Sequence, residues 1–279
     1  METDRFGDPL RALSGLTGHY SAIHDIRVGE IGGRDGRGRL VRIYSNGTGA
    51  PVLAVPDLGS SAAAWLGLTE PLCAAGRQLV SVDLPGSAHC DPLDAPGGDA
   101  HAEHLAAVTE QLLGGDRSAR SGETGCDIVG VGFGAYVVLT LATRRPDLVH
   151  RAVVIDPLLP PPSADAPRPR LSLGMMLDGA VTTVRRGRPL ANLAGLGRAR
   201  ATLGALADPD PAWWTALSAV TAPVLVVASG PSHADGATGA DALAARIPGA
   251  RRADLPPGVG GPHRDPERLA DLVVPFLRG

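Results

Sequence analysis

Four titratable side chains follow apolar segments of this 279-residue chain at points where a buried strand would end. Asp57 follows "PVLAVP", His233 and Asp235 follow "APVLVVASG", and His263 follows "PPGVGGP". Carboxylates and imidazoles are the side chains that most often move protons as general bases or acids. The pattern therefore predicts acid–base chemistry, with these four as the candidate catalytic residues.

Each candidate also has a plainer interpretation. Asp57 suits a cap of the turn before "GSSAAAW", and His263 suits an exposed loop. The segment "SGPSHADG", which holds His233 and Asp235, has the composition of a solvated loop. Two further histidines, His101 and His104, lie on a polar stretch and are expected to be a solvated face of a helix.

The segment "CDIVGVGFGAYVVLT", residues 126–140, predicts a strand, a glycine-rich turn and a helix. Its glycines stand at alternate positions, 130, 132 and 134. "GVGFGA" fits the dinucleotide-binding pattern, with Asp156 about 20 residues further on in place of the ribose-binding acid. That motif usually opens a fold, whereas here it follows a middle strand. Dinucleotide binding is a lesser alternative, and Asp156 is otherwise expected to cap or orient its strand end.

Composition excludes several functions. All 26 basic residues are arginine, so Schiff-base catalysis and a P-loop lysine are excluded. Basic and acidic residues are interspersed at a net charge of −3, which predicts no nucleic-acid partner. Cys73, Cys90 and Cys126 lack the spacing of a zinc or redox site and are expected to be buried free thiols in a reducing cytosol. The sequence shows no cofactor or metal site.

No apolar run reaches the roughly 18 residues of a membrane span, and the amino terminus lacks the apolar core of a signal peptide. We therefore expect a cytoplasmic protein with no membrane partner. The sequence leaves a homodimer open.

Short apolar segments alternate with stretches of helical length, such as 61–75, 101–113 and 134–145. Continuous apolar strands that alternate with helices are typical of a parallel sheet covered on both faces. The sequence therefore predicts an α/β fold with a mostly parallel sheet of about eight strands and its active site at their carboxyl ends. The segments expected as strands are 39–45, 51–59, 77–86, 126–132, 151–157 and 222–230.

The alternation stops between residues 157 and 212. "PLLPPPSADAPRPR" is too rich in proline for a helix or strand, and the residues after it suit short helices. We expect residues 157–212 to form a small helical cap. The core over which it lies would consist of residues 1–156, of which 1–25 are a leader segment, and residues 213–279. Apolar side chains in or beside this cap are candidates for lining a substrate pocket, although cap core is the plainer role: Met175, Met176, Trp213 and Trp214.

In this order, the segments resemble the α/β-hydrolase superfamily from about residue 39 to 279. The match includes "PVLAVPDLGSSAAAW", "SVDLPGSAHCD", "IVGVGFGAYVVLTLATRRPDLVHRAVVID" and "APVLVVASG". In that family a G-x-nucleophile-x-G turn lifts the nucleophile above the sheet. Here Gly132 stands at the nucleophile position, Asp57 in the oxyanion loop, His233 at the acid position and Gly261 at the histidine position. The resemblance therefore implies a divergent member that lacks the nucleophile.

The resemblance also implies that the backbone N–H groups of Leu58 and Phe133 stabilise a developing oxyanion, whatever their side chains are. With Gly132 leaving room for substrate, the sequence predicts a non-hydrolytic, cofactor-free enzyme. It would act on a hydrophobic, carbonyl-bearing small molecule by carbon–carbon bond formation, cyclisation or elimination in natural-product biosynthesis. The main alternative is a catalytically inactive binding protein, and a lesser one is a hydrolase whose nucleophile has moved to Ser60 or Ser61.

Overall fold

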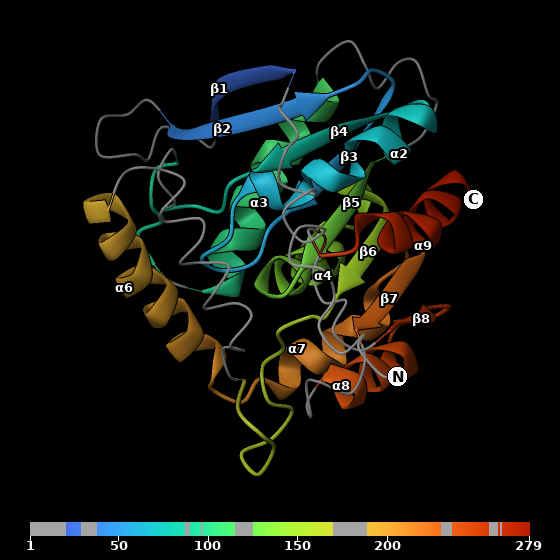
Figure 1. Ribbon diagram of the computed structural model, residues 1–279. Helices are drawn as coiled ribbons and strands as arrows, with labels where there is room; N and C mark the ends of the chain where they lie inside the picture. The colour runs from blue at the N-terminus through green and yellow to red at the C-terminus, as the bar shows by residue number, and fades with distance from the viewer. Residues whose placement is uncertain are drawn as a thin grey trace, which may run out of the picture.

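Eight strands form one sheet in the order β1-β2-β4-β3-β5-β6-β7-β8 (Figure 1). The computed structural model describes residues 21–28, 38–86, 90–95, 97–114, 125–169, 189–229, 236–256, 262 and 264–279. Strand β2 pairs antiparallel with β1 and β4, and all the other pairs are parallel. The strands are β1 (Ala22–Val28), β2 (Arg39–Asn46), β3 (Ala50–Val55), β4 (Arg77–Val82), β5 (Cys126–Val131), β6 (Val149–Ile155), β7 (Val224–Ser229) and β8 (Arg251–Leu255).

Helices cover both faces of the sheet, which confirms the predicted fold class (Figure 1). One face packs against α3 (Gly98–Gly114), α4 (Phe133–Arg144) and α8 (Gly236–Arg246). The other packs against the 3₁₀ helix η1 (Ala62–Leu68), α2 (Thr69–Ala74) and α9 (Pro266–Arg278). Because both faces are buried, the central strands are almost entirely apolar, as "APVLAV" in β3 and "VLVVAS" in β7 show.

The sequence failed to identify two strands, β1 and β8. Both lie at the edges of the sheet, where one side of the strand faces solvent. Most of the residues of β1 are exposed, and β8 begins with two exposed arginines. Neither strand has the apolar run that marks the central ones, because an edge strand does not need it.

Between β6 and β7 the chain leaves the sheet for the predicted cap region. Residues 157–169 have no regular structure, and α6 (Pro189–Leu206) and α7 (Pro211–Ala216) follow. Helix α6 lies apart from the sheet in Figure 1, and the Arg198 guanidinium donates to the Gly86 carbonyl after β4 over 2.5 Å. The cap boundary at 157–212 stays a prediction. Among the described residues, no helix has the length and apolar character needed to cross a bilayer.

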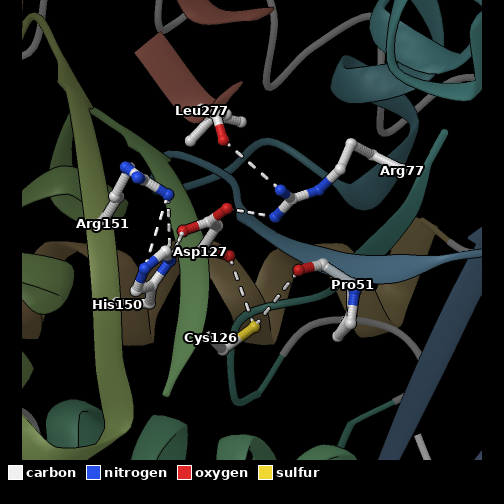
Figure 2. Close-up of polar contacts among 7 residues, drawn as sticks. All are labelled: Pro51, Arg77, Cys126, Asp127, His150, Arg151 and Leu277. Carbon is white, nitrogen blue, oxygen red and sulfur yellow. Dashed lines mark hydrogen bonds and ion pairs between the residues drawn. The ribbon is translucent and has the colours of Figure 1, made fainter. Parts of the chain in front are cut away.

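A buried ion-pair cluster ties together the amino-terminal edge of the sheet (Figure 2). The fully buried carboxylate of Asp127, in β5, pairs with Arg77 of β4 and with His150 of β6, whose Nδ1 lies 2.8 Å from Oδ1. Arg77 also donates to the carbonyl of Leu277 in α9 over 3.4 Å. The cluster therefore joins three strands and the C-terminal helix at the edge opposite the candidate active site.

The three cysteines are free thiols; Cys90 and Cys126 are buried as predicted, whereas Cys73 is only partly buried. Cys126 is buried beside this cluster, and its Sγ lies 3.6 Å from the Pro51 carbonyl oxygen (Figure 2). Burial raises the pKa of Cys126 to about 12, so the thiol stays protonated and packs as a small apolar group.

Candidate active site

The tight turn between β5 and α4 places Gly132 at the carboxyl edge of the sheet. Gly132 has φ 57° and ψ −119°, a left-handed backbone that favours glycine. Its two flanking glycines are required by close approach. A Cβ at Gly130 would lie 2.7 Å from the Gly134 carbonyl oxygen, and a Cβ at Gly134 would lie 2.5 Å from the Pro56 carbonyl oxygen. The turn is therefore tightly packed, and neither flanking position has room for a side chain.

The carboxylate of Asp57 lies directly over this turn. Its Oδ1 accepts two backbone hydrogen bonds of 2.8 Å, one from the N–H of Leu58 and one from the N–H of Phe133. These are the two N–H groups that the resemblance assigns to an oxyanion hole. The structure thus brings three predicted site residues together around one oxygen atom.

Asp57 also fills the space above Gly132. A Cβ built on Gly132 would lie 2.2 Å from Cγ of Asp57. The expectation that Gly132 leaves room for a bulkier substrate is therefore wrong for this arrangement, because the carboxylate occupies that room. The physical reason is local: Asp57 is the anion nearest to two converging amide donors, and charge-assisted hydrogen bonds are strong.

A second carboxylate, which the sequence analysis did not single out, holds the loop that carries Asp57. Asp83 follows β4 and is buried. Its Oδ1 accepts from the N–H of Ala62 over 2.9 Å, and its Oδ2 accepts from the Tyr44 hydroxyl over 3.1 Å. The signal was present in "SVDLPG", an acid at a strand end directly before a turn. Asp83 anchors the end of the loop that begins at Pro56.

Asp156 performs the role that was expected at its strand end. Its Oδ1 accepts from the N–H of Ser229 over 2.8 Å, and its Oδ2 accepts from the Ser229 hydroxyl. The carboxylate thereby joins the carboxyl ends of β6 and β7. This contact gives no support to the dinucleotide alternative, which requires the same carboxylate to bind a ribose.

The expectation that His101 and His104 are solvated is wrong. His101 is buried and meets the ring of Phe133 edge-on, with the ring centroids 5.0 Å apart. Burial lowers the pKa of His101, and it lowers the pKa of His104 to about 4. The turn of α3 that carries them faces α4 because buried alanine, leucine and valine side chains share that face. Both imidazoles are therefore neutral near pH 7.

Trp213 and Trp214 are buried and serve as packing residues of α7. The indole N–H of Trp213 donates to the Thr140 hydroxyl over 2.9 Å, and that of Trp214 donates to the Pro160 carbonyl over 2.8 Å. The Trp213 ring packs against Tyr136, with centroids 5.1 Å apart. These contacts agree with the plainer interpretation, in which both tryptophans are core.

Five of the predicted site residues lie outside the described residues, so their roles stay predictions: Met175, Met176, His233, Asp235 and His263. Among the residues that the structure describes, no group of three or more metal-ligating side chains is close enough to hold an ion.

The fold and the turn at Gly132 define an α/β-hydrolase-like protein, and comparison with known families agrees. The model of the alpha/beta hydrolase family matches residues 52–272, most of the chain. The chain therefore belongs to the α/β hydrolase family.

One related enzyme and two solved structures resemble this chain at low sequence identity. It is 27% identical over 122 residues to the 2-hydroxymuconate semialdehyde hydrolase of Pseudomonas sp. (strain CF600), a match that spans 42% of this chain and 40% of that enzyme. A serine hydrolase involved in carbazole degradation superposes with a TM-score of 0.65 at 18% identity, over 92% of this chain and 99% of that one. A thermophilic esterase from Thermogutta terrifontis superposes with a TM-score of 0.65 at 20% identity, over 91% and 98%. At these identities the two structures share the fold alone.

Proposed function

We propose that this protein is a non-hydrolytic enzyme on the α/β-hydrolase fold, in which Asp57 transfers the proton and no residue of the turn is a nucleophile. The observation that supports this proposal is the Asp57 carboxylate, whose Oδ1 accepts from the N–H groups of Leu58 and Phe133 above Gly132. The substrate class is a hydrophobic, carbonyl-bearing small molecule. The reaction class is carbon–carbon bond formation, cyclisation or elimination in natural-product biosynthesis.

The two amides fix the carboxylate in a defined orientation before substrate arrives. The carboxylate held in this way accepts a proton from the carbon beside the substrate carbonyl. A base that is already oriented gives up little entropy in the transition state. Proton transfer by such a group is worth about 10²–10⁴-fold in rate.

Proton transfer also changes which oxygen the amides bind best. When Asp57 takes the proton it becomes a neutral acid, and the substrate carbonyl becomes an enolate. Hydrogen bonds to a charged oxygen are about twice as strong as those to a neutral one. The N–H groups of Leu58 and Phe133 therefore favour Asp57 before the step and the enolate oxygen after it. In cyclisation the enolate carbon attacks a second carbonyl carbon of the substrate, and the oxygen of that carbonyl takes the proton back from Asp57. In elimination the enolate expels a leaving group from the adjacent carbon, and the leaving group takes that proton.

A binding protein without catalysis is the second candidate, and one observation favours it. The carboxylate that fills the space over Gly132 also occupies the two amide donors that a substrate oxygen would need. In that case ligand would bind beneath the cap and leave unchanged. The two candidates differ in whether Asp57 ever exchanges a proton with ligand.

The test is deuterium exchange at the acidic carbon of hydrophobic β-diketones and aryl ketones, followed by NMR in D₂O. We expect the wild-type protein to accelerate the exchange of at least one compound, and Asp57→Asn to reduce that rate about 100-fold, the typical value of a general base. Asp147→Asn, at an exposed ion pair with Arg145, is the matched control and keeps the wild-type rate. Full exchange activity in Asp57→Asn contradicts the mechanism, and ligand binding without exchange identifies a binding protein.

Ester hydrolysis provides an independent check. We expect nitrophenyl acetate to turn over no faster with this protein than with serum albumin at matched concentration. Ser60 and Ser61 are the nearby hydroxyls, and Ser61 is buried. Stoichiometric labelling of either serine by a fluorophosphonate would instead show a hydrolase with a relocated nucleophile.

A further inference from the structure

The segment that leaves β6 holds Gly132 by both of its backbone polar groups. The N–H of Gly132 donates to the carbonyl of Ile155 over 3.0 Å, and its carbonyl accepts from the N–H of Leu158 over 3.0 Å. The same carbonyl also accepts from the N–H of Tyr136, in α4, over 3.3 Å. Between Ile155 and Leu158 lies Asp156, which has φ 43°. Among the described residues it is the only non-glycine with a left-handed backbone. The chain must reverse at Asp156 for both Ile155 and Leu158 to reach Gly132.

Strand β7 fixes this reversal from the other side. The N–H of Asp156 donates to the carbonyl of Val227 over 2.9 Å, and the Asp156 carboxylate accepts from both the N–H and the hydroxyl of Ser229. Ser229 is the last residue of β7 and is only 2% exposed. An uncommon backbone conformation persists only where its surroundings over-determine it, and such positions concentrate at functional sites. Here the backbone of Asp156 is held by its hydrogen bond to Val227, and its side chain is held by the two hydrogen bonds from Ser229.

The reversal controls the direction of one amide that binds Asp57. The carbonyl of Gly132 and the N–H of Phe133 belong to the same peptide unit. That unit is planar and trans, so the two groups point in opposite directions. Leu158 and Tyr136 together hold the carbonyl, so the Phe133 N–H points away from it, toward Oδ1 of Asp57 at 2.8 Å. The Tyr136 bond belongs to α4 and does not depend on Asp156, so loss of the Leu158 bond loosens this peptide unit without releasing it.

We propose that Asp156 is a positioning residue for the site. Through Ser229 it holds the reversed backbone that puts the Leu158 N–H on the Gly132 carbonyl, and so it aims the Phe133 N–H. The other donor, Leu58, lies in the Asp57 loop and does not depend on Asp156. The role of Asp156 in turnover rests on the proposed function, whereas its effect on the Phe133 amide is a property of the protein by itself.

The experiment measures the Phe133 and Leu58 amides by NMR in the wild-type protein and in Asp156→Ala, Asp156→Asn and Ser229→Ala. We expect Asp156→Ala to shift the Phe133 amide proton upfield and to speed its exchange with solvent about tenfold, as expected for the loss of a hydrogen bond to a charged group. Leu58 keeps its wild-type exchange rate. Asp156→Asn retains an acceptor oxygen and a residue that tolerates the left-handed region, so it restores most of the Phe133 protection.

Selectivity for Phe133 distinguishes positioning from general destabilisation. A general loss of stability speeds amide exchange equally at Phe133, at Leu58 and in the core strands, and that result overturns the proposal. An unchanged exchange rate of the Phe133 amide in Asp156→Ala overturns it as well. If Asp156→Ala does not fold, Ser229→Ala takes its place, because it removes the hydroxyl that donates to Asp156 and leaves the Asp156 residue intact. We then expect faster exchange of the Phe133 amide in Ser229→Ala, and an unchanged rate overturns the proposal. If Asp57→Asn leaves proton exchange of the ketones unchanged, the proposed function fails while the amide measurement still decides the role of Asp156.

Discussion

Two aspartates at opposite edges of one sheet are held by opposite kinds of partner. Asp57, at the carboxyl edge, is half-buried and accepts from the backbone N–H groups of Leu58 and Phe133. Asp127, at the amino edge, is fully buried and pairs with Arg77 and His150 (Figure 2). Backbone N–H groups hold the Asp57 carboxylate in a fixed orientation, whereas two basic side chains hold that of Asp127 in a buried ion-pair cluster. The first arrangement suits chemistry and the second suits stability.

The largest effect is expected from Asp127→Ala. It leaves the guanidinium of Arg77 buried without its anion, and breaking a buried pair in this way costs about 3–5 kcal/mol of unfolding free energy. Urea denaturation measures the loss. Asp147→Ala, at an exposed ion pair with Arg145, is the control and leaves the midpoint nearly unchanged. A loss below about 1 kcal/mol in Asp127→Ala would remove the stabilising half of the comparison.

The next effect comes from a side chain at Gly132. Gly132→Ala places a Cβ 2.2 Å from Cγ of Asp57 on a left-handed backbone, and we expect a loss of about 2–4 kcal/mol from overpacking and strain together. In an Asp57→Gly background the overpacking disappears, so the loss shrinks by at least about 1 kcal/mol.

A matched control for backbone strain is Gly76→Ala, because Gly76 has φ 71° and no atom within 4 Å of an added Cβ. Gly76→Ala should lower the free energy of unfolding only by the part of the Gly132→Ala loss that comes from backbone strain. Equal losses for Gly132→Ala with and without Asp57 would show that the carboxylate does not fill that space in solution.

The stability of the protein in acid also depends on His104, which belongs to neither aspartate site. Burial lowers the pKa of His104 to about 4 in the folded protein, from 6.5 in the unfolded chain. Below pH 6.5 the unfolded chain binds the proton more tightly, so stability is present above that pH and is lost as pH falls toward 4. Between pH 7 and pH 5 the loss is about 1–2 kcal/mol.

His104→Leu should flatten this part of the pH profile of urea unfolding, whereas His24→Leu, on the exposed face of β1, should leave it unchanged. An unaltered profile in His104→Leu would assign the acid sensitivity to other groups.

The smallest effect on stability is expected from Asp57→Ala. Water can reach the half-buried site and satisfy the amides of Leu58 and Phe133, so the free energy of unfolding should change by less than about 1 kcal/mol. A small loss agrees with the proposed catalytic role of Asp57, because residues that serve activity are seldom optimal for stability. A loss in Asp57→Ala as large as that in Asp127→Ala would show that both carboxylates are structural.

The sequence by itself determined the fold and predicted the tight turn beside which the proposed site lies. Apolar segments such as those of β3, β5 and β7 predict buried parallel strands, because a strand can be apolar at every position only when both faces of the sheet are covered. The edge strands β1 and β8 carry no such signal. The three alternate glycines likewise predict a tight turn, since each has a steric or conformational reason to lack a side chain.

Only the tertiary structure decided how the site residues meet. The sequence suggested Asp57 as a base, and Leu58 and Phe133 as amide donors to substrate, but not that the two amides would bind Asp57 itself. It also placed His101 and His104 in solvent, because the contacts that bury them come from distant parts of the chain: Phe133, which packs on His101, lies about 30 residues further along. Local patterns set which backbone each segment adopts. Which donor finds which acceptor depends on distances between segments far apart in sequence, and those distances exist only in the folded chain.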